Sequence, residues 1–519
     1  MYDLLITNAS IVDGTGSPAY FGDIGISSGK IVRIGKELGD AKQVIDATGL
    51  TVTPGFIDSH SHSDRAFLDF PEMIEKVEQG ITTSIAGQCG ESAAPINREI
   101  TPEKATYFEG FGKATDVCRT MGTFLDIVKN IPMGSNNAML VGHGALRMAV
   151  MGTENRAPTE AELEQMKELL RDGMEHGALG VSLGLIYIPS CYAKTDELIE
   201  IAKVVKEYHG IVTAHIRDES NTVIQAVHEF IEIIRASGAR GVLSHHKSTR
   251  IENWGKVSHS LRMIDEANRE GLEIYSDVYP YVASSTTVST SFMPKDKQSG
   301  GAERIVAVLS NPEERKEIKE WAKARWGNDL SWMQIIVCKA YPEYEGLLVP
   351  EIARLRGTDQ YDAIYDMIAD SENVCRAIYF TMCEEDVKMV MAHPRVMICT
   401  DSSVAKNDPV FHPRLKGSFP RVLGRYVREC HVTSLQEMIR KMTAMPARVY
   451  GLKTKGLIWE GMDADLCIFD AEKIIDHSEF TNCNQRAEGL NYVILGGEVV
   501  AENAIYNGKK PGRLLLRNE

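Results

Sequence analysis

The stretch that decides the fold runs from Ile211 to Lys247 and reads "IVTAHIRDESNTVIQAVHEFIEIIRASGARGVLSHHK". It begins with a short apolar run typical of a buried strand, residues 211–217, and ends with a second one, residues 241–247. Between them, apolar residues recur at i, i+3, i+4 and i+7, which is the pattern of a helix with one buried face. This order predicts two parallel strands joined by a crossover helix.

The same pattern continues on both sides of this unit. Further apolar runs of strand length lie at residues 55–60, 82–87, 138–144, 179–186, 273–279 and 396–401. Helical patterns, for example at residues 159–177 and 195–210, lie between them. Eight strands with intervening helices predict an α/β fold, a (β/α)8 TIM-type barrel spanning residues 56–452. A doubly wound open sheet is the alternative fold.

The two ends of the chain differ from the middle. Residues 1–55 and 453–519 alternate short apolar runs with glycine turns, which is typical of short antiparallel strands. We expect both ends to form one small β-sandwich domain, because chain ends often lie close together. The connection between Tyr281 and Val396 is too long for a simple loop and predicts an insertion or lid at residues 283–345. It would shape the active site or serve oligomer contacts.

Composition excludes several classes of protein. The net charge of −15 excludes non-specific nucleic-acid binding, which needs basic surface. The chain has no apolar stretch of about 18 residues and no signal peptide, so we expect no membrane contact. Its 10 cysteines form no CxxC pairs, which indicates reduced thiols in the cytoplasm. A small-molecule substrate is the expected partner, and the sequence leaves open whether the protein forms a homo-oligomer.

Residues able to bind a metal follow five of the predicted strands. Histidines follow strands one, five and six, a cysteine follows strand two, and an aspartate follows strand eight. They are His60 and His62, Cys89, His215, His245 and Asp401. A free cysteine usually packs as a small apolar residue, but imidazole, thiolate and carboxylate together are the ligands that zinc prefers. The carboxyl ends of barrel strands share one face, so the sequence predicts a metal site there.

These motifs resemble the amidohydrolase superfamily over nearly the whole chain. Within it, "GQCG", "AHIRDE", "SHHK", "YPY" and "HPRLKGSFPRVLGRY" resemble the D-aminoacylases, or N-acyl-D-amino-acid deacylases. The resemblance implies zinc-dependent hydrolysis of an N-acyl-D-amino acid to a carboxylate and a free D-amino acid. It also implies that a cysteine after strand two is a metal ligand. Strand four offers no lysine at its end, unlike the binuclear members that use a carbamylated lysine.

With this resemblance, we expect one tightly held zinc bound by Cys89, His215 and His245. His60 and His62 would form a second, weaker site. Asp401 would take a proton from the attacking water and give it to the departing amine, which leaves poorly unless protonated. In the D-aminoacylases a glycine usually follows this aspartate, whereas here the residue is Ser402.

The substrate carries a free carboxylate, so we expect a fixed cation in the pocket. Lys247, two residues after His245, is the first candidate. Arg414 and Arg421 could pair with a carboxylate or anchor their own segment. The remaining predicted substrate-binding residues are Tyr281, Ser284, Ser285 and His143, the last as a group that polarises the scissile carbonyl.

Two other functions stay open at this stage. A cyclic amidohydrolase of the dihydroorotase or hydantoinase kind would share the fold and chemistry, but such enzymes usually have the strand-four lysine. A non-catalytic protein with the same fold would have lost metal ligands, whereas all six positions are filled here.

Overall fold

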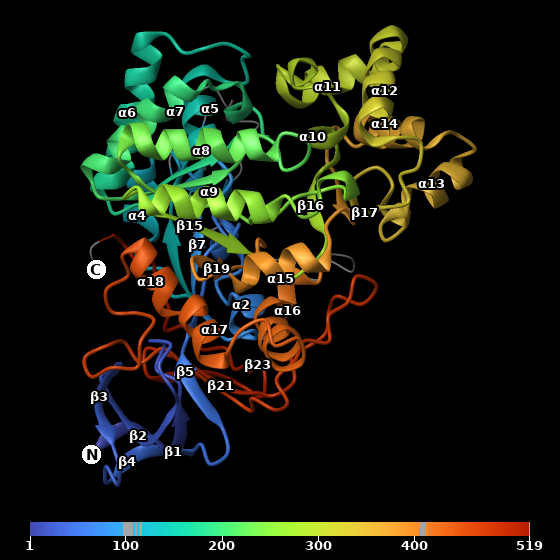
Figure 1. Ribbon diagram of the computed structural model, residues 1–519. Coiled ribbons are helices and arrows are strands. Elements are labelled where there is room, and N and C mark those ends of the chain that lie inside the picture. The colour runs from blue at the N-terminus through green and yellow to red at the C-terminus, as the bar shows by residue number, and fades with distance from the viewer. Residues whose placement is uncertain (97–106, 109–111, 114–116, 405–411, 518–519) are drawn as a thin grey trace.

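The structure is a computed structural model that describes residues 1–96, 107–108, 112–113, 117–404 and 412–517. It is a mixed α/β fold with two parallel sheets in its middle (Figure 1). The predicted alternation of strands and helices is confirmed.

The parallel strands lie in two sheets, in the orders β10–β7–β6 and β11–β12–β13–β14–β15–β19. Their bounds are β6 Phe56–Asp58, β7 Ile81–Ala86, β10 Asn136–Met139, β11 Val141–Gly142, β12 Gly180–Gly184, β13 Ile211–His215, β14 Arg240–Leu243, β15 Ile274–Val278 and β19 Val396–Ile398. Leu140 alone separates β10 from β11, and both overlap the third predicted strand, residues 138–144. Ser59 Oγ, just after β6, donates to the Ile398 carbonyl at 3.0 Å, so the first and last strands are neighbours.

Amphipathic helices cover these strands because strands buried on both faces need apolar partners. Capping residues mark some of the ends of these helices. Thr159 and Glu162 form a capping box at the start of α6, and Gly238 ends α8 in a left-handed conformation. The bounds are α4 Met121–Val128, α5 His143–Met151, α6 Glu160–Glu175, α7 Thr195–Glu207, α8 Val223–Ser237, α9 Val257–Arg269, α15 Glu384–Ala392, α17 Leu435–Met442 and α18 Ala444–Tyr450.

Shorter elements complete the middle of the chain. They are α1 Ala66–Asp69, α2 Ile74–Val77, β8 Tyr107–Phe108, β9 Gly112–Lys113, α16 Arg414–Arg421, the π-helix η5 Val422–Glu429, and the 3-10 helices η1 Ser190–Tyr192 and η2 Ile251–Asn253. None of the helices in the described ranges is both long and apolar enough to cross a membrane.

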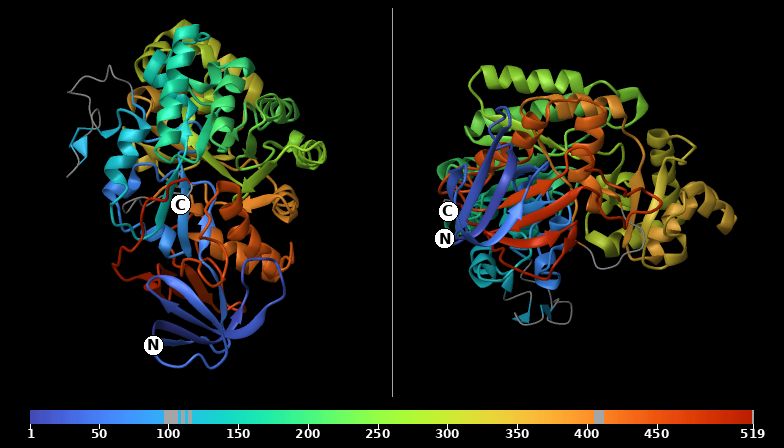
Figure 2. Two further views of the ribbon diagram at one scale, coloured as in Figure 1. Left: turned by 90° about the vertical axis from the view of Figure 1, so that its left-hand side faces the viewer. Right: turned by 90° about the horizontal axis from the view of Figure 1, so that it is seen from below.

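Both ends of the chain contribute to one nine-stranded sheet, which lies below the parallel strands in Figure 1. Its strands are β1 Tyr2–Ile11, β2 Tyr20–Ser27, β3 Lys30–Gly35, β4 Ala41–Asp46, β5 Thr51–Pro54, β20 Leu466–Phe469, β21 Leu490–Leu495, β22 Glu498–Glu502 and β23 Ile505–Tyr506. The two ends join where β5 pairs antiparallel with β20, with Thr53 opposite Cys467. Figure 2 shows the N-terminal and C-terminal strands side by side.

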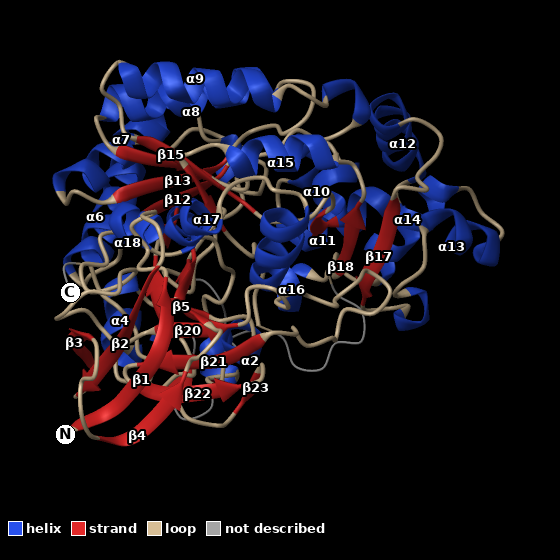
Figure 3. Cartoon of the chain, turned by 60° about the horizontal axis from the view of Figure 1, so that its bottom comes forward, coloured by secondary structure: helices blue, strands red, loops and turns tan. Residues whose placement is uncertain are grey.

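The long connection between β15 and β19 folds into a separate unit, set apart from the parallel strands in Figure 3. Its antiparallel sheet has the order β16–β18–β17, and Phe292 packs with Trp326 and Trp332 in its own core. The elements are β16 Ser284–Thr287, α10 Val288–Phe292, η3 Lys295–Gln298, α11 Gly301–Ser310, α12 Pro312–Trp326, β17 Met333–Cys338, η4 Pro342–Tyr344, α13 Val349–Arg356, α14 Gln360–Asp370 and β18 Cys375–Tyr379. The predicted insertion, residues 283–345, lies inside this unit, which continues to β18.

Lys441, on α17, is a fully buried lysine that gives a test of the fold. Its Nζ donates to the carbonyl oxygens of Met391 and His393, and burial lowers its pKa to about 7. In the unfolded chain the pKa returns to about 10.4, so the unfolded state binds the proton more tightly and stability rises as pH rises. From pH 7 to pH 10, we expect the native protein to gain on the order of 3 kcal/mol relative to K441M. Urea unfolding of both proteins at pH 7 and pH 10 measures this. The prediction is contradicted if the difference in unfolding free energy between the two proteins is the same at both pH values.

Candidate functional site

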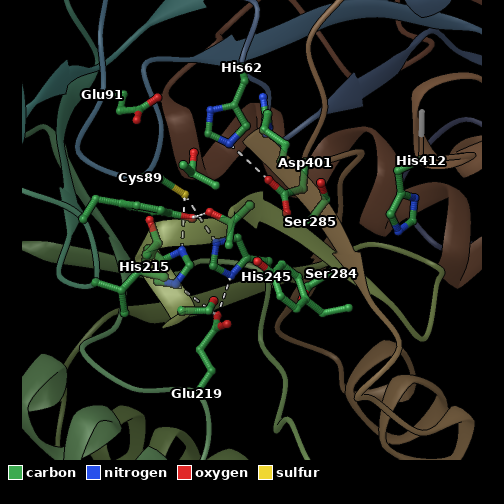
Figure 4. A pocket seen from close by; sticks show the side chains of 18 of the residues that line it. His62, Cys89, Glu91, His215, Glu219, His245, Ser284, Ser285, Asp401 and His412 are labelled. Atoms are coloured by element: carbon green, nitrogen blue, oxygen red, sulfur yellow. Dashed lines mark hydrogen bonds and ion pairs between the residues drawn. The ribbon is translucent and has the colours of Figure 1, made fainter. Parts of the chain in front are cut away.

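A cavity of about 950 Å³ opens at the carboxyl ends of the parallel strands. Figure 4 shows Cys89, His215 and His245 pointing toward one another on one wall, with His62 and Asp401 beside them. The unit between β15 and β19 contributes further lining residues, among them Ser284, Ser285, Trp326 and Arg376. The cavity therefore lies where the predicted metal ligands meet the predicted insertion.

Cys89 lies at the centre of the histidine cluster. Its Sγ is 3.3 Å from His60 Nε2, 3.3 Å from His245 Nε2 and 3.6 Å from His215 Nδ1. The loop after β7 can place it there because both flanking glycines have positive φ and close neighbours. A Cβ on Gly87 would lie 2.2 Å from the Leu140 carbonyl oxygen, and one on Gly90 would lie 2.7 Å from the Gly184 nitrogen. The two glycines of "GQCG" thus let the backbone pack closely enough to aim the thiol inward.

A second group forms around Asp401, beyond the end of β19. One carboxylate oxygen, Oδ1, lies 3.1 Å from His62 Nε2 and 3.6 Å from His60 Nε2. The other, Oδ2, accepts a hydrogen bond from Arg414 Nη1 at 2.6 Å. Arg414 therefore holds the Asp401 carboxylate in place.

Two carboxylates contact the histidines: Glu219, which lines the cavity, and the fully buried Asp277. Glu219 Oε1 is 3.0 Å from His245 Nδ1 and 3.6 Å from His215 Nε2. Asp277, on β15, accepts the His245 backbone N–H at 2.5 Å, and its other oxygen lies 3.7 Å from His60 Nδ1. Carboxylates in this position orient imidazole ligands and fix their tautomers.

Burial sets the protonation of the site. It lowers the pKa of His215 and His245 well below the usual value and raises the pKa of the Cys89 thiol well above it. Burial also tends to raise the pKa of Asp401, but the Arg414 charge and the His62 contact outweigh it and hold that pKa well below its usual range. At neutral pH the two histidines are therefore neutral, the form that binds metals, and Asp401 is an anion.

The donor set fits a zinc ion. Three sets of donor atoms each lie within 4.8 Å of one another: His60, Cys89 and His245; His60, His62 and Asp401; and His215, Glu219 and His245. Buried His60 Nδ1 and His215 Nε2 have no hydrogen-bond partner among the described residues. A thiol with neutral imidazoles suits zinc, and a coordinated thiol is deprotonated despite its burial.

The predicted substrate-binding residues divide into two sets. Lys247, Ser284, Ser285 and Arg414 line the cavity. Lys247 is nearly buried, and its Nζ lies 2.5 Å from Glu219 Oε1, so its charge already has one carboxylate partner.

The structure does not bring Tyr281, Arg421 and His143 to the cavity wall. The Tyr281 hydroxyl donates to the Pro413 carbonyl, and Arg421 pairs with Asp476 at 3.4 Å. His143 is fully buried, with its Nε2 3.0 Å from Glu197. Each of the three side chains binds a partner outside the cavity. The expectation that they line the pocket is therefore corrected.

Sequence reasoning missed Glu219, Asp277 and Tyr187, of which Glu219 and Tyr187 line the cavity. Signals existed for the two carboxylates. Glu219 lies four residues after His215 in "AHIRDES", and Asp277 is an acidic residue inside the predicted strand "EIYSDVY". A charged residue inside a buried strand needs a polar partner, which could have identified Asp277.

Comparisons with known proteins agree with this geometry. The chain matches the model of the amidohydrolase family over residues 43–501. It is 33% identical to the D-aminoacylase of Alcaligenes xylosoxydans xylosoxydans, covering 99% of this chain and 98% of that protein. It is 34% identical to the N-acyl-D-glutamate deacylase of the same organism, covering 99% and 97%. The crystal structure of N-acyl-D-glutamate deacylase from Bordetella bronchiseptica, complexed with zinc and a phosphonate inhibitor, matches with a TM-score of 0.84 at 34% identity over 99% of each chain. The chain belongs to the amidohydrolase family and, within it, to the D-aminoacylases.

Proposed function

We propose that this protein is a zinc-dependent hydrolase that cleaves the amide bond of N-acyl-D-amino acids, releasing a carboxylate and a free D-amino acid. The observation that carries the proposal is the buried cluster of Cys89 with three histidines beside the Asp401 carboxylate, at one cavity. Membership of the D-aminoacylases supplies the substrate class.

Cys89, His215 and His245 would hold the tightly bound zinc, and His60 with His62 would form the weaker site. When bound, zinc supplies Lewis-acid chemistry, which polarises a carbonyl group and acidifies a water molecule. Proximity of Asp401 to both His60 and His62 supports the second site. The His62 pKa is raised, since the Asp401 contacts outweigh burial, so a proton competes for that imidazole.

Asp401 would carry the proton through the reaction. Its carboxylate is ionised at neutral pH and can accept the proton of the attacking water. It would then donate that proton to the amine nitrogen, and Arg414 keeps the carboxylate in place during both transfers. Asp401 would thus be the general base in the attack of water and the general acid in the departure of the amine.

Lys247, Ser284 and Ser285 would bind the substrate carboxylate. All three line the cavity, and two of them belong to β16 of the unit between β15 and β19. The three donors of the Lys247 ammonium already face Glu219 Oε1, His245 Nδ1 and the His245 carbonyl, so Lys247 would exchange one of these contacts for the substrate carboxylate.

We infer that the two parallel sheets form one closed (β/α)8 barrel over residues 56–452. The Ser59–Ile398 bond and the parallel bridge between Ser61 and Ser402 support closure at one seam, and the continuity of β10 and β11 supports it at the other. Residues 1–55 and 453–519 would form the small β-sandwich domain. The scattered cysteines, without CxxC pairs, suit reduced thiols and a cytoplasmic location.

A substrate screen tests the function. We expect the zinc-loaded protein to hydrolyse N-acetyl-D-methionine or N-acetyl-D-glutamate at least about 10²-fold faster than the matching L-isomer, a difference in transition-state stabilisation of about 2.7 kcal/mol. Removing the metal with a chelator should abolish turnover, and added zinc should restore it. Preference for an L-isomer or for a hydantoin would contradict the substrate class.

A further inference from the structure

A buried ion pair lies behind the site, outside the residues that line the cavity. Lys76, on α2, contacts Asp58, at the end of β6, with Nζ 2.8 Å from Oδ2, and both side chains are fully buried. A buried charge is costly unless it is paired and fully hydrogen-bonded. The chain therefore keeps this pair at a position where apolar residues would be easier to accommodate.

The pair binds the residues on both sides of Asp401. Lys76 Nζ donates to Thr400 Oγ1 at 2.9 Å and to the Ser402 carbonyl at 3.0 Å. Asp58 accepts hydrogen bonds from the Thr400 backbone N–H at 2.8 Å and from its hydroxyl at 2.7 Å. The backbone that carries Asp401 is thus held immediately before and immediately after it.

Asp401 needs such support because its φ is 49°, in the left-handed region that L-residues rarely adopt. Strained backbone of this kind persists only where the surrounding structure fixes it. The Asp401 backbone N–H also donates to the His60 carbonyl at 2.9 Å, so the same conformation joins the base to the first histidine.

We propose that Lys76 and Asp58 are positioning residues that hold Asp401 in its left-handed conformation and thereby aim its carboxylate at the reacting water. The inference rests on the proposed role of Asp401 as the base. Neither residue lines the cavity, so the pair acts on turnover through Asp401 and leaves substrate binding alone. It also leaves the tight zinc site intact, since Cys89, His215 and His245 lie at or after the ends of other strands, β7, β13 and β14.

The test compares K76M with K441M in the zinc-loaded protein. Lys441 is a matched control because it is also fully buried and bonds to backbone carbonyls, but lies away from the site. For K76M we expect kcat to fall about 10²-fold, as for a misplaced catalytic group, with KM within about threefold of the native value. Its tight zinc should stay bound, as measured by metal analysis. K441M should keep both kcat and KM.

Two results with K76M would overturn the inference: a native kcat, or loss of the tight zinc together with activity, which would mean that the pair supports the fold in general. T400V gives a milder version for the case that K76M does not fold, since it removes one hydroxyl that contacts both Lys76 and Asp58. We expect kcat of T400V to fall about tenfold, as for a lost hydrogen bond, at unchanged KM and zinc content. An unchanged kcat in T400V also overturns the inference.

The activity of D401A separates this inference from the proposed role of Asp401. If D401A is active, Asp401 is not the base. If D401A is inactive and K76M is fully active, Asp401 keeps its role as the base and only the positioning role of Lys76 is disproved.

Discussion

Replacing Cys89 by alanine is expected to remove the tightly bound zinc and the hydrolytic activity together, while the protein still folds. The thiol is the shared neighbour of His60, His215 and His245, with Sγ between 3.3 and 3.6 Å from each ring. Without it, the cluster keeps only imidazoles and loses the anionic ligand that balances the metal charge. Turnover should drop by at least about 10³-fold, because the Lewis acid that activates the water is lost.

Metal analysis after dialysis and rate measurements on one N-acetyl-D-amino acid check this result. Cys467 provides a matched control, because its thiol is also fully buried, in β20 of the small sheet, where it donates to the Gly80 carbonyl. C467A should keep one tight zinc and near-native kcat. Zinc retained by C89A at native affinity would remove Cys89 from the ligand set.

Replacing Asp401 by asparagine is expected to lower kcat by about 10³-fold while the tight zinc stays in place. Asparagine keeps the size of the side chain but cannot accept and return the proton. Arg414 would lose its carboxylate partner at 2.6 Å, so some loss of stability should accompany the loss of turnover. Measurements of kcat, zinc content and urea unfolding on the same preparation separate these effects.

The ion pair of Asp476 with the partly exposed Arg421 offers a control for that loss of stability. Asp476 is nearly buried and lies 3.4 Å from Arg421, away from the cavity wall. D476N should destabilise the protein without changing turnover by more than about twofold, since ΔΔG values at distant sites are nearly independent. A native kcat in D401N would disprove its role as the base, whatever its stability.

Much of this site could be predicted because its residues follow strands directly. His60, Cys89, His215, His245 and Asp401 each lie at or just after a predicted strand, and parallel strands bring their carboxyl ends to one face. The backbone pattern alone therefore predicted which residues would meet.

The substrate-binding residues were harder to predict for a physical reason. Position near a strand end does not fix the direction of a long side chain or its partner. His143 contacts Glu197 and Arg421 contacts Asp476, and each partner lies more than 50 positions away in the sequence. Each of these contacts satisfies a buried polar group, and that requirement decided the direction of the side chain.

The sequence by itself determined the alternation of strands and helices, the set of zinc-binding residue types and the enzyme family that they resemble. Local apolar periodicity and short motifs carry that information, because they depend on neighbours in the chain. Only the tertiary structure decided how the site is held: Glu219 contacts His245, Arg414 pairs with Asp401, and Lys76 with Asp58 binds the residues on both sides of Asp401. These contacts join residues up to 342 positions apart, and such pairings arise only when the buried charges of the folded chain must find partners.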